Sequence, residues 1–144
     1  MKEINCVDKD RRGLLFYFCL GGSARVEDLE FLVSCGANKF LEGLYAESLC
    51  EFPKKEIMEY FISKGESINT LYSGEFNAVH NLCADQILNM ETLLFLHQNK
   101  ADFTVRDLHG LTPFYHLIKN ERCTLEMVKF AVQNRECSDF LFFN

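Results

Sequence analysis

The chain has 144 residues and a formal net charge of −6, and 48% of its residues are hydrophobic while 25% are charged. This composition is typical of one globular domain with a substantial core, and it argues against a disordered chain. The negative charge gives no support to binding of nucleic acid or of an anionic membrane surface. No apolar run reaches the roughly 20 residues of a membrane-spanning helix, so we expect no membrane partner either.

The seven cysteines lie far apart in the sequence, without the close pairs that zinc ligands form. An odd number of cysteines cannot make a complete disulfide framework. We therefore interpret them as reduced thiols in an intracellular, cytoplasmic protein.

Apolar residues at helical spacing predict four longer helices, at 26–36, 55–65, 90–100 and 125–135. Each has Glu at its second position and a large aromatic residue at its sixth. Gly36 and Gly65 can take the left-handed conformation that ends a helix, whereas Lys100 and Arg135 stand at that place in the other two. We expect the aromatic residues to pack between stacked helices; they are Phe31, Tyr60, Phe95 and Phe130.

A shorter apolar helix precedes each longer one, at 14–20, 46–50, 77–83 and 112–118. Asn77 and Thr112 are good N-caps, and Pro113 suits a first helical position. Polar turns precede three of these helices, at 10–13, 73–75 and 107–110. The repeating unit is therefore a turn, a short helix, a longer helix and a loop. We expect the third and fourth units to carry about two extra residues between their helices, at 86–89 and 121–124.

Residues 107–115, Asp-Leu-His-Gly-Leu-Thr-Pro-Phe-Tyr, resemble the signature of ankyrin repeats, in which an Asp-x-x-Gly turn leads to Thr-Pro-Leu-His. Gly-Ala-Asn at 36–38 and Lys-Ala-Asp at 100–102 resemble the Gly-Ala-Asp that closes such a repeat. The resemblance implies one all-α domain over 1–144, a solenoid of stacked helix-turn-helix units with projecting turns. Its repeats are 5–37, 38–68, 69–102 and 103–137, and the apolar tail 138–144 either caps the array or continues a longer one.

The resemblance also implies a function, because ankyrin repeats usually bind proteins in a concave groove beside their turns. We expect a monomeric scaffold, adaptor or inhibitor that binds another protein there. The expected turn contacts are Arg11, Arg12, Glu42, Ser73, Glu75, Leu108 and His109. The first helices and their ends are expected to add Glu51, Phe52, Asp85, His116 and Lys119.

The alternative is a small metal- or thiol-dependent protein that uses its Cys and His residues. His80 and Cys83 lie on one helical face, but they lack two further ligands nearby, so packing is the favoured interpretation. Cys50 and Cys83 are taken as matching small core residues, His97 as buried and Cys123 as the most exposed thiol. We therefore predict no catalytic residue, no metal, no cofactor and no enzyme activity.

Overall fold

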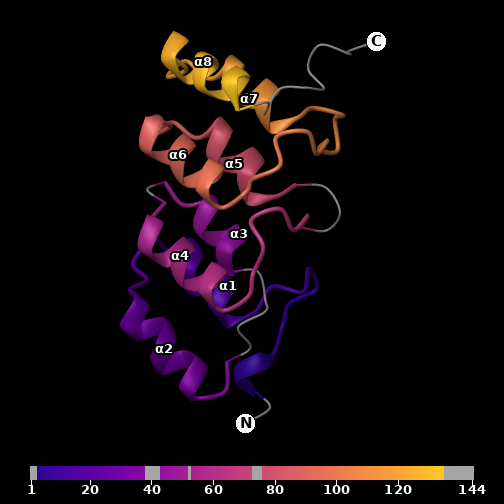
Figure 1. Ribbon diagram of the computed structural model, residues 1–144. Coiled ribbons are helices and arrows are strands. Elements are labelled where there is room, and N and C mark those ends of the chain that lie inside the picture. Colours follow the sequence, from indigo (N-terminus) through magenta and orange to yellow (C-terminus); the bar gives the residue numbers. More distant parts are fainter. Residues whose placement is uncertain (1–2, 38–42, 52, 73–75, 135–144) are drawn as a thin grey trace. The chain divides into compact units, whose positions relative to one another are not determined.

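The computed structural model describes residues 3–37, 43–51, 53–72 and 76–134. These ranges contain eight α-helices and a short 3-10 helix at Glu3–Asn5, but no strand, so the fold is all-α as predicted (Figure 1). An isolated bridge joins Tyr72 and Phe76. None of the described helices has the length and apolar character to cross a membrane.

The chain divides into two compact units, Met1–Ser67 and Ile68–Asn144. Unit 1 contains α1 (Leu14–Leu20), α2 (Val26–Ser34), α3 (Gly43–Ser48) and α4 (Lys55–Ser63). Unit 2 contains α5 (Ala78–Ala84), α6 (Met90–Gln98), α7 (Pro113–Lys119) and α8 (Leu125–Gln133). In unit 1, α3 packs against α1 and α4, and in unit 2, α5 packs against α6 and α7.

All four helix pairs share one spacing, because each second helix begins 12 residues after the first helix of its pair. The extra residues that we placed between the helices of the third and fourth pairs are therefore not there. The second pair follows the first at a shorter interval in the sequence, because the connection 35–42 has fewer residues than the connections 64–77 and 99–112. The constant spacing also corrects one match. The sixth residues of the first helices are Cys19, Ser48, Cys83 and Ile118, so Cys50 does not match Cys83.

Side-chain caps begin every helix of unit 2. The side chains of Asn77, Asn89, Thr112 and Thr124 accept hydrogen bonds from the backbone N–H three residues later. Each cap satisfies an N–H that the helix leaves unpaired, which stabilises a helix by about 1 kcal/mol. The caps predicted at Asn77 and Thr112 and the first helical position predicted for Pro113 are confirmed.

The helices α2, α4 and α6 end alike, at a residue in the left-handed region. Gly36 and Gly65 have φ angles of 97° and 102°, as predicted, and Lys100 takes the same place with φ 56°. The next backbone N–H then reaches back to close the helix, as in the bond from Ala101 to the carbonyl of Leu96 (3.0 Å). Arg135 lies outside the described residues.

Each unit has its own apolar core. In unit 1 the Phe61 ring lies directly over Gly43, where an added Cβ would approach the ring to 2.1 Å. Glycine is therefore required at the start of α3. The largest fully buried apolar side chains are Phe16, Leu29, Ile57 and Phe61 in unit 1, and Val79, Leu82, Leu88, Leu93, Leu96 and Leu117 in unit 2.

Two predictions about burial are wrong. Phe31 was expected between helices, but 66% of it is exposed, and His97 was expected to be buried but is exposed as well. Tyr60 and Phe95 are buried as predicted, and Phe130 is half-buried with its ring edge-on to His97, 5.3 Å between centroids. Within each unit, the sixth residue of the later second helix (Tyr60 or Phe130) faces the preceding pair, and the described residues include no pair before α1–α2.

Candidate interaction surface

Asp107 holds a tight turn in front of α7. Its Oδ1 accepts hydrogen bonds from the backbone N–H of His109 (2.8 Å) and of Leu111 (2.9 Å), while Asp107 itself is only 7% exposed. Gly110 completes the turn with φ 76° and donates to the Asp107 carbonyl. The turn projects its two central side chains away from the core, and Leu108 is 61% exposed.

The second oxygen of Asp107 connects this turn to α7. Nε2 of His116 lies 2.8 Å from Oδ2 of Asp107. Burial would raise the pKa of Asp107, but hydrogen bonds from His116, Leu111 and His109 outweigh it and hold that pKa below its usual value. The turn and the helix are therefore one rigid element.

His80 lies beneath this element and supports it from α5. The ring is almost fully buried, and its Nε2 donates to the carbonyl of Val105 (3.0 Å), while Nδ1 accepts from the backbone N–H of Asn77 (3.3 Å). Its edge meets the His116 ring at 5.9 Å between centroids. Burial lowers the pKa of His80, so it is neutral near pH 7. The packing role predicted for His80 agrees with these contacts.

Unit 1 contains the same arrangement of hydrogen bonds, centred on Asp8. Oδ1 of Asp8 accepts from the backbone N–H of Asp10 (2.8 Å) and of Arg12 (2.9 Å), and the Tyr17 hydroxyl donates to Oδ2. Arg11 has φ 63° and stands where Gly110 stands in unit 2. The Tyr17 hydrogen bond lowers the pKa of Asp8. In both units the anchoring side chain follows the Asp by nine residues.

Because the first turn begins at Asp8, its tip is formed by other residues than we predicted. The exposed central residues are Lys9 and Asp10, which our sequence analysis missed because it placed the turn at 10–13. Arg11 is exposed beside them, whereas Arg12 is half-buried with its guanidinium 5.0 Å above the Phe16 ring. The nine-residue interval from an Asp to a ring-bearing side chain was the signal that could have found them.

The remaining predicted contacts differ in their surroundings. Lys119 at the end of α7 and Glu51 after α3 are exposed. Asp85 is half-buried and serves the fold, because its carboxylate accepts from the backbone N–H of Ile87 (2.7 Å) and its carbonyl accepts from the Asn120 amide (2.7 Å). Four predicted contacts lie outside the described residues: Glu42, Phe52, Ser73 and Glu75.

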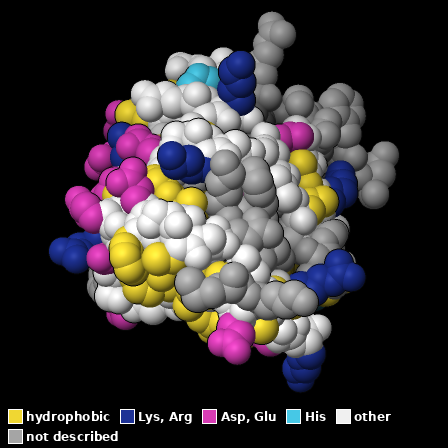
Figure 2. Space-filling model, turned by 90° about the horizontal axis from the view of Figure 1, so that it is seen from below, with side chains coloured by type: hydrophobic (Ala, Val, Ile, Leu, Met, Phe, Trp, Pro, Cys, Tyr) yellow, Lys and Arg dark blue, Asp and Glu magenta, His cyan; other side chains and the backbone are white. Residues whose placement is uncertain are grey.

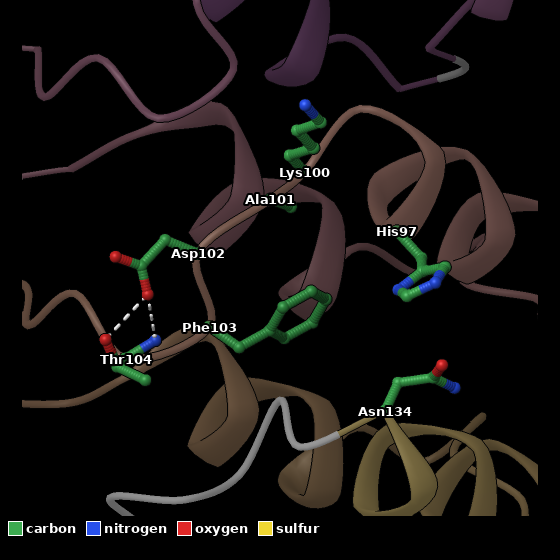
Figure 3. Close-up of a pocket in the computed structure, with 7 residues that line it drawn as sticks. All are labelled: His97, Lys100, Ala101, Asp102, Phe103, Thr104 and Asn134. Atoms are coloured by element: carbon green, nitrogen blue, oxygen red, sulfur yellow. Dashed lines mark hydrogen bonds between the residues drawn. The ribbon is translucent and has the colours of Figure 1, made fainter.

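A shallow pocket of about 320 Å³ lies in unit 2 beside the end of α6. Figure 3 shows its Phe103 ring directed toward His97 and Asn134. The Asp102 carboxylate accepts hydrogen bonds from the backbone N–H and the hydroxyl of Thr104 (2.8 and 2.6 Å). The only acidic group among the lining residues, that of Asp102, is therefore already engaged.

The thiols have the properties of packing residues. Burial raises the pKa of Cys50 to about 11, and it raises the pKa values of Cys19 and Cys123 as well. A protonated thiol is a weak nucleophile. Cys123 is half-buried while Cys6 is exposed, so the prediction that Cys123 is the most exposed thiol is wrong. Among the residues described, no group of three or more His, Cys, Asp or Glu is placed to hold a metal ion.

Comparison with known proteins assigns no relative to the chain. No family model matches the sequence, and no curated protein matches it. What the chain does must therefore be inferred from its own geometry.

Proposed function

We propose that this chain is an ankyrin-type module that binds another protein through its projecting turns and the adjacent faces of its first helices, and that it is not an enzyme. One observation carries the proposal. An Asp-anchored turn of the same kind occurs in both units, tied to Tyr17 in unit 1 and to His116 in unit 2.

The turn is more elaborate than a connection requires. In unit 1 it holds Arg11 in a left-handed conformation, which opposes folding. Yet the side chains at its tip add little to the core, since Leu108 points outward. A rigid tip loses little conformational entropy on binding, which favours affinity. The proposed contacts are Lys9, Asp10, Leu108 and His109, with Lys119 beside them.

Two kinds of link support a stacked, ankyrin-like arrangement of the pairs within each unit. The Cys50 thiol donates to the carbonyl of Cys19 (2.9 Å), and the Asn120 amide donates to that of Cys83 (3.0 Å). Cys50 and Asn120 both stand at the eighth position counted from the start of a first helix, and both acceptors stand at the sixth. The same link therefore joins neighbouring first helices in both units.

The second kind of link lies at the opposite end of the helix pairs. The Asn5 amide donates to the carbonyl of Gly36 (2.8 Å), and the Asn69 amide donates to that of Lys100 (3.0 Å). Each of these bonds joins the segment before a first helix to the end of the second helix of the same pair, so the two pairs are closed alike, as equivalent units of a solenoid are.

The chemistry of the thiols favours binding over a thiol-dependent reaction, since the raised pKa values keep them protonated near pH 7. Free thiols at Cys19, Cys35, Cys50 and Cys123 also support a location in the reducing interior of the cell. We therefore include a cytoplasmic location in the proposal.

The test compares two double variants of the full chain. Leu108→Ala/His109→Ala removes the tip of the second turn, and Glu91→Ala/Gln98→Ala removes two exposed side chains of α6 as a matched control. Proteins captured by the wild type are identified, produced in pure form and titrated against all three chains by calorimetry. We expect the tip variant to weaken binding at least 10-fold and the control to bind as the wild type does. Equal binding by all three chains would contradict the proposed surface.

A further inference from the structure

The first helix pair leaves an apolar face uncovered. Phe31 and Leu14 are exposed there, and with Phe18 and Leu32 they line a hollow of about 400 Å³. Figure 2, which is seen from below relative to Figure 1, shows hydrophobic side chains gathered on the side turned to the viewer. An exposed apolar face of this kind marks a contact surface more often than a solvated one.

The other helix pairs indicate what such a face contacts. In unit 1, α4 contacts α2, and burial together with the nearby Glu30 carboxylate raises the pKa of Tyr60, the sixth residue of α4. In unit 2, Phe130, the sixth residue of α8, meets the ring of His97, the eighth residue of α6. The sixth residue of a second helix therefore lies against the second helix of the preceding pair, near its fifth to eighth residues.

Phe31 is the sixth residue of α2, so it stands at the position that makes this contact. It is exposed, and the described residues contain no preceding second helix for it to pack against. The position that would receive such a residue is exposed on α8. Val132 is the eighth residue of α8, as His97 is of α6, and it is 52% exposed. Leu125, 69% exposed, and Lys129 continue the same helical face at intervals of four and three residues.

We propose that two copies of this chain associate head to tail, with the α1–α2 face of one copy seated on the α7–α8 face of the other. Phe31 then packs against Val132 of the second copy, as Phe130 packs against His97 within the chain. Asp28 also lines the hollow beside Phe31, but its carboxylate forms an ion pair with Arg25 (2.9 Å), so the contact rests on the apolar side chains of the two faces.

This association has a distinctive form. The two faces belong to opposite ends of the chain sequence, so each copy that binds through one face still offers the other. Such heterologous contacts extend into rings or filaments instead of stopping at a dimer. The contact uses none of the turn-tip residues, so it stands independently of the proposed partner binding, and it replaces the expectation of a monomer.

The full chain and two single variants test the proposal by sedimentation velocity between about 1 and 300 µM, the range in which moderate interfaces dissociate. We expect the average mass of the wild type to rise steadily with concentration. Phe31→Asp and Val132→Asp should each be monomeric, because each lacks one face. Their equal mixture should form a dimer and nothing larger, because only one intact pair of faces remains.

Leu71→Asp is the matched control, since it places the same charge at another exposed leucine and should associate as the wild type does. Circular dichroism and thermal unfolding check that all variants keep the fold. A wild type that is monomeric throughout the range would overturn the proposal. So would single variants that still associate, or a mixture of folded variants that remains monomeric.

Discussion

Glu47 is a carboxylate in the core of unit 1. Its side chain is fully buried, and Oε1 accepts a hydrogen bond from the backbone N–H of Lys54 (2.7 Å). Burial raises the pKa of Glu47, and the contacts with Lys54 offset this only in part. A carboxyl whose pKa is higher in the folded state prefers to be protonated there. Its ionisation therefore lowers stability as the pH rises from the ordinary Glu value through the raised one.

Glu47→Gln keeps an oxygen for Lys54 and removes the charge. We expect the free energy of unfolding at pH 7 to increase by roughly 1 kcal/mol, the scale of one poorly solvated polar group. The difference from the wild type should shrink as the pH falls toward about 4.5. Urea unfolding at pH 7 and pH 5 measures both effects, and a variant less stable than the wild type at pH 7 would contradict this account.

Lys100 adopts a backbone conformation that glycine takes at the equivalent places. Its φ of 56° brings Cβ close to the following carbonyl, which costs roughly 1 kcal/mol for a residue other than glycine. Lys100→Gly should therefore stabilise the protein by about that amount, since the hydrogen bond from Asn69 to its carbonyl is kept. Gly65→Ala is the matched control and should have the opposite sign. Thermal unfolding measures the change in stability of both variants. Changes of the same sign in the two variants would contradict the conformational cost assigned to Lys100.

At the scale of elements, the Asp107 turn and α7 form one electrostatic device. Asp107→Asn leaves an oxygen for the backbone N–H groups but removes the charged partner of His116. We expect a loss of about 2 kcal/mol at pH 7, the scale of a hydrogen bond to a charged group. Because folding lowers the pKa of Asp107, its contribution is present above the ordinary Asp value. It is lost as the pH falls through the lowered one.

The measurement is urea unfolding of wild type and Asp107→Asn from pH 7 down to pH 3, and the difference between the two should shrink as the pH falls below the ordinary Asp value. Asp8→Asn provides the comparison in unit 1, where the same arrangement is exposed to solvent. Solvent screens exposed charges, so we expect a smaller loss there. A loss for Asp107→Asn that is the same at pH 7 and pH 3 would show that charge is not the cause.

The starts of the longer helices could be predicted from the sequence. Which residues occupy equivalent positions in different pairs could not. Helical spacing and caps are local properties, so α2, α4, α6 and α8 begin at the predicted residues. The first turn was misplaced because Arg11 stands where a glycine was expected. Cys50 was matched by residue type instead of by its distance from the next helix. Phe31 and His97 were assigned to the wrong environment because their burial depends on neighbouring pairs, which a single helix pattern does not contain.

At the scale of the whole molecule, the two units differ in how their helices are stabilised. Every helix of unit 2 begins with a side-chain cap, whereas α1, α2 and α4 in unit 1 begin at Gly13, Arg25 and Lys54 without one. Unit 1 also contains the buried Glu47 carboxylate and the uncovered face around Phe31.

We therefore expect unit 1 to open before unit 2. Hydrogen exchange followed by mass spectrometry at pH 7 should show faster exchange of the backbone amides in α1–α4 than in α5–α8. Glu47→Gln should slow exchange in α3 and α4 more than in α7 and α8. Equal protection of both units would contradict the expectation.

The constant 12-residue interval within each helix pair has a consequence for how such a chain can change. Residues 14–34, 43–63, 78–98 and 113–133 are segments of equal length, each spanning both helices of a pair. Because the segments have equal lengths, recombination could exchange one for another without changing the spacing of the helices around it. Insertions and deletions would then be confined to the connections, of which 35–42 is shorter than 64–77 and 99–112. Duplication of whole segments would lengthen the array while leaving each existing contact in place.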